Sequence, residues 1–169
     1  MPSFIPNKTV MLSKEQEHLW SDSIGGLLLN LGGIEFATFR WIQHFATDSL
    51  VSDLAIDMPL SKRLQIIREL IERSSFSPES RKRAIELWIE VGKISELRNT
   101  IAHNPIVFGA GVDGKQVMGI PNFKNMKGSG PFTVTLVHVS KIIEAAHRLV
   151  VISGELDKLI VEHDKPKHD

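Results

Sequence analysis

The chain has 169 residues, enough for one domain with a substantial core. Hydrophobic residues make up 42% and charged residues 24%, a balance that excludes disordered and fibrous proteins. The 20 basic and 20 acidic residues cancel, so any binding of nucleic acid has to come from a local patch rather than from overall charge.

Cysteine is absent, which excludes disulfides, zinc–thiolate sites and cysteine nucleophiles and fits a reducing compartment. The first twenty residues lack the basic-then-apolar pattern of a signal peptide. No apolar run of about 18 residues is free of charges, so we expect no membrane span. These features together predict a soluble, cytoplasmic protein.

The N-terminal part of the sequence predicts an irregular arm followed by a long helix. Residues 1–12 contain two prolines, and Ser13 and Gln16 then have the spacing of a capping box. From about residue 23 to residue 45, apolar residues recur at helical spacing. This stripe consists of Leu27, Leu31, Ile34, Trp41 and Phe45.

Two glycine pairs interrupt this first helical pattern. Gly25-Gly26 and Gly32-Gly33 lie seven residues apart and therefore share one face of a helix. Because glycine is unfavourable inside a helix, the pairs indicate a close approach of another helix, within the fold or across a dimer. The alternative is a break of the helix at Gly32-Gly33.

Three further helices and one insertion complete the predicted fold. Pro59 opens a helix over about 60–73, and Ser77-Pro78 starts a third that runs to about Ala102. The segment 105–136 reads as a β-hairpin around Asp113-Gly114, a loop and one more extended piece. A last helix covers about 138–162. We therefore predict an all-α four-helix bundle over residues 13–163, with a short β-hairpin insertion between helices 3 and 4 and a frayed tail at 164–169.

The stretch ELRNTIAHNPI places a fixed cation and a titratable ring at the end of the third helix. Arg98 and His103 are five residues apart, which separates them by about 140° on an ideal helix. Asn104 precedes a proline, so the helix is expected to end near Ala102 and to let His103 swing back beside Arg98. The simplest reading is that both residues cap the helix, with Asn99 on the surface and Asn104 in the turn.

A functional reading assigns the same residues to phosphate chemistry. Arginine binds phosphate oxygens with a planar fork of donors, and histidine transfers protons near neutral pH. An adjacent amide can orient the ring or bind substrate. This set suits metal-free RNA cleavage, in which a ribose 2′-hydroxyl attacks the neighbouring phosphate.

The motif R-N-T-I-A-H, Arg98 to His103, resembles the signature of HEPN domains, in which arginine and a polar residue precede a histidine. The helix before it and the final amphipathic helix also match, over roughly residues 13–162. The resemblance implies a homodimer with both motifs in one cleft and a metal-independent endoribonuclease that acts as a toxin or in defence. It assigns catalysis to Arg98 and His103 and support to Asn99. It also implies RNA as substrate and a nucleotidyltransferase-like antitoxin as partner. Some HEPN proteins instead bind RNA, a nucleotide or a protein without cleavage.

Several other polar residues allow both a functional and a structural interpretation. Glu35 lies near the inner stripe of the first helix. If its carboxylate is buried it needs a partner, and Arg98 is one candidate. The alternative is that Glu35 lies at the edge of the stripe, where it contacts solvent or pairs with Arg40. The basic residues of 60–83 could follow an RNA backbone, but interspersed glutamates favour an ordinary solvated face. Lysines 115, 124 and 127 of the insertion could touch RNA. The scattered histidines have no partner at a metal-binding spacing, so we expect no metal and no cofactor.

Overall fold

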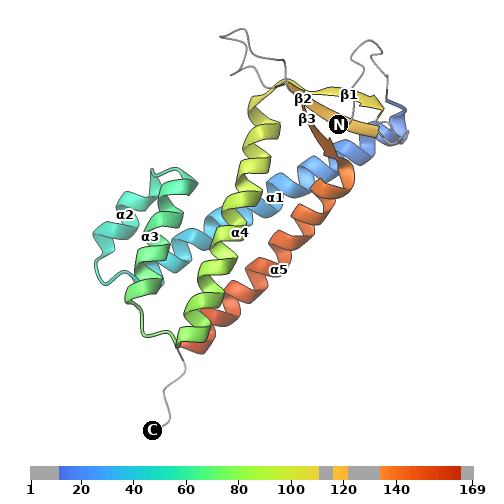
Figure 1. Ribbon diagram of the computed structural model, residues 1–169. Coiled ribbons are helices and arrows are strands. Elements are labelled where there is room, and N and C mark those ends of the chain that lie inside the picture. Colours follow the sequence, from blue (N-terminus) through green and yellow to red (C-terminus); the bar gives the residue numbers. More distant parts are fainter. Residues whose placement is uncertain (1–11, 111–115, 122–133, 165–169) are drawn as a thin grey trace. The chain divides into compact units, whose positions relative to one another are not determined.

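The computed structural model describes residues 12–110, 116–121 and 134–164 (Figure 1). The predicted arm and tail lie outside this part of the chain except for Leu12 and Asp164. The described residues form five helices and a three-stranded sheet. The elements are α1 (Lys14–Phe45), α2 (Ser49–Ile56), α3 (Leu60–Arg73), α4 (Pro78–His103), β1 (Val107–Ala110), β2 (Gln116–Pro121), β3 (Val134–His138) and α5 (Val139–His163).

The long helix α1 begins with the predicted capping box. The backbone N–H of Ser13 donates to Gln16 Oε1 at 2.7 Å, and the N–H of Gln16 donates to Ser13 Oγ at 3.3 Å. The helix then continues through Gly32-Gly33, so the alternative of a break there is wrong. A Cβ on any of the four glycines would meet no atom of the described residues within 4 Å. A close approach by this part of the chain therefore does not explain the glycine pairs, whereas the dimer explanation stays a prediction.

The helix count of four was one too low. The predicted bounds of α3, α4 and α5 are confirmed to within one residue, but the short helix α2 was not expected. Asp48 starts it by accepting a hydrogen bond from the N–H of Leu50 at 2.9 Å. Leu50, Leu54 and Ile56 are exposed and Ala55 is the buried residue of this 8-residue helix, so its apolar pattern is short. The fold is mostly helical with a small antiparallel sheet.

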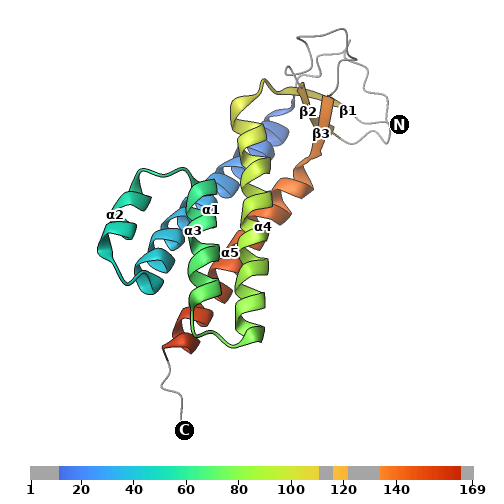
Figure 2. The same cartoon turned by 60° about the vertical axis from the view of Figure 1, so that its left-hand side comes forward.

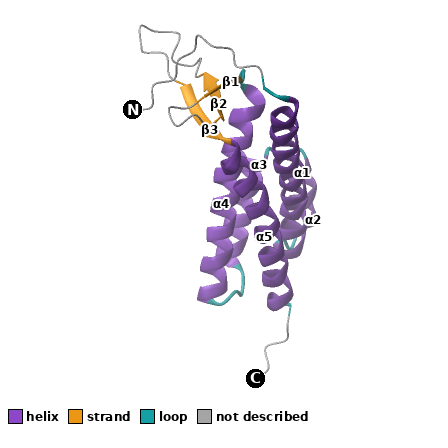
Figure 3. Ribbon diagram, turned by 90° about the vertical axis from the view of Figure 1, so that its right-hand side faces the viewer, coloured by secondary structure: helices purple, strands orange, loops and turns teal. Residues whose placement is uncertain are grey.

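The sheet has the order β1-β2-β3 with antiparallel neighbours (Figure 3). Ala110 pairs with Gln116, as expected for a hairpin around Asp113-Gly114, although that turn lies outside the described residues. Residues 117–121 of the central strand β2 are buried, with Val117 and Met118 almost inaccessible. Strand β3 confirms the predicted extended piece and leads directly into α5.

The chain divides into two compact units. One comprises Met1–Leu28 and Glu96–Ala146, and the other comprises Leu29–Ser95 and His147–Asp169. Helices α1, α4 and α5 contribute residues to both units, and the prediction of one domain over 13–163 stays a prediction. None of the helices in the described part of the chain is both long and apolar enough to cross a bilayer.

Aromatic packing organises each unit. In the first, Trp20 of α1 packs on Phe108 of β1 with ring centroids 5.3 Å apart. In the second, the edge of Trp41 meets Trp88 of α4 at 5.5 Å. Within this second unit, α3 and the N-terminal part of α4 run side by side (Figures 1 and 2).

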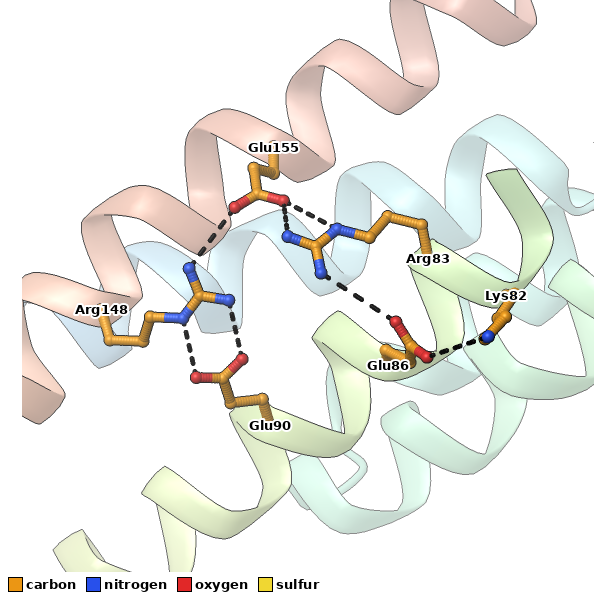
Figure 4. Close-up of polar contacts among 6 residues, drawn as sticks. All are labelled: Lys82, Arg83, Glu86, Glu90, Arg148 and Glu155. Carbon is orange, nitrogen blue, oxygen red and sulfur yellow. Dashed lines mark hydrogen bonds and ion pairs between the residues drawn. The ribbon is translucent and has the colours of Figure 1, made fainter. Parts of the chain in front are cut away.

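An ion-pair network joins α4 to α5 within the second unit (Figure 4). Arg148 forms a bidentate ion pair with Glu90. Its Nε donates to Oε1 at 2.7 Å and its Nη2 donates to Oε2 at 2.9 Å. Arg148 also reaches Glu155, which in turn accepts hydrogen bonds from Arg83. The hydrogen bonds from Arg148 hold the pKa of the Glu90 carboxyl below its ordinary value.

Candidate functional site

The motif predicted to be functional lies at the C-terminal end of α4. The helix ends at His103, one residue later than expected, and Asn104 follows in a bend. The side-chain amide of Asn104 donates to the carbonyl of Thr100 at 2.9 Å. Asn104 therefore acts as the turn residue that the simple reading assigned to it, and it satisfies one of the free carbonyls of the last turn.

Arg98 and His103 occupy different sides of α4. Arg98 is half-buried and follows the buried stripe, four residues after Ile94 and three before Ile101. His103 is exposed and shares the outer face with Asn99, which is also exposed and one turn away. Because His103 is still helical, the expected swing back beside Arg98 does not occur. About 140° separates the two residues around the helix axis.

The exposure of His103 argues against the interpretation that this residue only caps its own helix. A histidine that only capped its own helix would be buried against the last carbonyls, whereas His103 is exposed and Asn104 makes the capping contact. The ring of His103 is therefore accessible to a ligand from solvent. Arg98 is half-buried, so it is less accessible than His103.

Glu35 is half-buried and lies in the second unit, where it faces Arg63 of α3. Their closest atoms, Glu35 Oε2 and Arg63 Nη2, are 3.6 Å apart. Arg63 is itself buried, and its guanidinium lies over the ring of Phe39, 4.4 Å from the centroid. Arg40, one of the partners considered from the sequence, pairs with Asp157 at 3.0 Å. The Arg63 contact could not be found from spacing, because the two residues are on separate helices.

The basic stretch of residues 60–83 is largely paired with carboxylates. Arg73 pairs with Glu69 and Lys82 with Glu86 along their own helices, and Arg83 reaches Glu155. This pattern matches the expectation of an ordinary solvated face rather than an RNA track. The lysines of the insertion, residues 115, 124 and 127, lie outside the described residues.

A cavity of about 190 Å³ lies between α3 and α4 in the second unit. Its walls are mainly apolar and include Leu64, Ile71 and Ile89, with Gln65 and Arg68 as polar members. Such a lining suits an apolar group more than a phosphate chain.

Sequence reasoning missed a group of three potential metal ligands. His44 at the end of α1, His163 at the end of α5 and Asp164 each offer one donor atom, and these atoms lie within 4.8 Å of one another. Asp164 was expected in a frayed tail, but its N–H donates to the carbonyl of Ile160 at 3.1 Å. The separation of 119 residues between the histidines gave no motif. Their shared position at predicted helix ends was the one available signal.

Comparison of the chain with protein-family models, with curated proteins and with solved structures finds no match. The resemblance to HEPN domains accordingly depends on residues 98–103 and on the helices around them.

Proposed function

We propose that the protein is a metal-independent endoribonuclease of HEPN type that acts as a homodimer. Arg98 and His103 of each copy are the catalytic residues in this proposal. The observation that supports it is the exposed ring of His103 at a helix end already capped by Asn104, with the cation of Arg98 fixed further back on the same helix.

The proposed reaction is a transesterification within the RNA strand. One His103 removes the proton of a ribose 2′-hydroxyl, and the oxygen attacks the adjacent phosphorus. The bond from phosphorus to the 5′ oxygen breaks, and the second His103 returns a proton to that leaving oxygen. Arg98 stabilises the charge that builds on the phosphoryl oxygens. The products are a 2′,3′-cyclic phosphate and a free 5′-hydroxyl.

The two-copy arrangement follows from the number of groups that this reaction needs. An acid and a base must act on opposite sides of one phosphorus, but each copy supplies a single histidine in the motif. The exposed position of His103, on the other side of the helix from Arg98, suits a site completed by a second chain. Asn99, one turn before His103 on the same face, would bind the ribose or orient the ring. In this proposal the protein is a toxin or defence nuclease, with a nucleotidyltransferase-like protein as the antitoxin.

The test is incubation of the purified protein with tRNA and total RNA in the presence of a chelator. Arg98→Ala and His103→Ala are assayed beside it, with His138→Ala as the matched control, because His138 is an exposed histidine of the same unit. Light scattering confirms a common oligomeric state. We expect cleavage with cyclic phosphate ends by the parent and the control, no cleavage by His103→Ala, and cleavage slower by about 100-fold or more by Arg98→Ala. Absence of cleavage by a folded, dimeric parent would favour the alternative, a HEPN-like module that binds RNA, a nucleotide or a protein.

A further inference from the structure

Three electron-pair donors converge where the C-terminal ends of α1 and α5 meet in the second unit. Nε2 of His44 lies 3.3 Å from Nδ1 of His163 and 3.4 Å from Oδ1 of Asp164. The third side of this triangle, from His163 Nδ1 to Asp164 Oδ1, is 3.9 Å. We propose that His44, His163 and Asp164 form a binding site for a divalent transition-metal ion, with Zn²⁺ as the best match and a fourth position open to water.

The spacing of the donors fits a tetrahedral ion. Zinc binds histidine nitrogen at about 2.0–2.1 Å and carboxylate oxygen at about 2.0–2.2 Å, so two ligands of a tetrahedron are about 3.3–3.5 Å apart. Two of the three separations already have this value. The third, at 3.9 Å, is longer, and the Asp164 side chain that would have to move is 60% exposed. Two imidazole ligands and one carboxylate favour Zn²⁺. Mg²⁺ and Ca²⁺ bind oxygen ligands, so this site should not prefer them.

A neighbouring hydroxyl orients one of the rings. Ser75 Oγ lies 3.0 Å from Nε2 of His163, the nitrogen that points away from the cluster. A proton on Nε2 that is donated to Ser75 leaves the lone pair of Nδ1 facing His44 and Asp164. A hydrogen bond of this kind at the second ring nitrogen fixes the tautomer of a metal-bound histidine.

Aromatic contacts restrict both imidazoles before any ion arrives. The His163 ring meets Phe45 and Phe76 edge-on, each with centroids 4.9 Å apart, and the His44 ring meets Phe45 at 4.5 Å. The two histidine side chains are about four-fifths buried. Little ordering is therefore left for the ion to impose. Without an ion, the Nε2–H of a neutral His44 donates to Nδ1 of His163, so a bound ion takes the place of that proton.

The test uses the full chain, stripped with a chelator and titrated with Zn²⁺ alone by calorimetry. We expect one ion per chain and, at about 100 times the dissociation constant, a rise in melting temperature of about 5–10 °C. Co²⁺ in place of Zn²⁺ should give the visible absorption of a tetrahedral nitrogen and oxygen site. RNA is absent from these measurements, so they are independent of the ribonuclease proposal.

Variants locate the site. His44→Ala should abolish stoichiometric binding, and Ser75→Ala should weaken it about 10–100-fold, because the hydrogen bond that orients the His163 ring is lost. Asp164→Asn changes an exposed side chain and tests the site even if His44→Ala fails to fold. His147→Ala, an exposed histidine on α5, is the matched control and should bind as the parent does. Absence of binding by the parent, or binding that survives both His44→Ala and Asp164→Asn, would overturn the proposal.

Discussion

The side chain of Asn104 donates a hydrogen bond to the backbone carbonyl of Thr100 at 2.9 Å and so closes the last turn of α4. His103, between them in sequence, remains exposed. Asn104 thus supports the helix end, whereas the adjacent His103 is the proposed catalytic residue. Stability and activity should consequently respond to different substitutions at this helix end.

Substitution of Asn104 by alanine should lower the free energy of unfolding by about 1 kcal/mol, because it leaves a carbonyl of the last turn without its partner. His103→Ala should change stability by less than about 0.5 kcal/mol, as expected of an exposed position. Urea unfolding of the two variants beside the parent measures both effects. A larger loss for His103→Ala than for Asn104→Ala would show that the histidine is the structural residue.

Arg98→Ala should reduce RNA cleavage by about 100-fold or more, since a donor to developing phosphate charge is removed. Arg98→Lys keeps the positive charge but loses the planar fork, so it should fall between the parent and Arg98→Ala. Initial cleavage rates on one tRNA, with chelator present, provide the comparison. Equal rates for the parent and Arg98→Ala would remove Arg98 from the mechanism.

The pH dependence of stability should contain a contribution from Glu90. Its pKa is lowered in the folded protein by the hydrogen bonds from Arg148, so the contribution is present above the unfolded pKa of about 4.5. It is lost as the pH falls through the lower folded value. The Glu90 side chain is 37% exposed, so solvent screens the pair, and Glu90→Gln should cost about 0.5 kcal/mol near pH 7 and progressively less towards about pH 3.

Urea midpoints of Glu90→Gln and the parent across this range give the measurement. Glu72→Gln, which changes an exposed carboxyl on α3, is the matched control and should run parallel to the parent. If the difference between Glu90→Gln and the parent stayed constant with pH, the Glu90–Arg148 pair would not be the source of the effect.

The helices could be predicted from sequence where a buried stripe and a start signal coincided. Ser13 with Gln16 and Ser77 with Pro78 marked starts that the structure has at Lys14 and Pro78. Helix α2 was missed because it has only 8 residues, so its apolar spacing covers too few positions to stand out as a helical pattern.

The local part of the candidate site was predictable, but its tertiary contacts were not. The role of Asn104 followed from the proline after it, which is a constraint between neighbours in sequence. The pairing of Glu35 with Arg63 and the approach of His44 to His163 depend on how separate helices pack. The spacing of residues along the chain therefore could not predict these contacts.

Substitution of Gly33 by alanine should raise the free energy of unfolding by about 0.5–1 kcal/mol. Gly33 is exposed inside the continuous helix α1, and a Cβ there would meet no atom of the described residues within 4 Å. Alanine gains the helix propensity that glycine lacks and introduces no clash with this part of the chain. Urea unfolding at low protein concentration, where a dimer dissociates, measures this effect alone.

If Gly33→Ala stabilises the monomer but weakens self-association in light scattering, a second copy approaches α1 closely at this glycine pair. Equal self-association of variant and parent would show that the pair is not at a dimer contact.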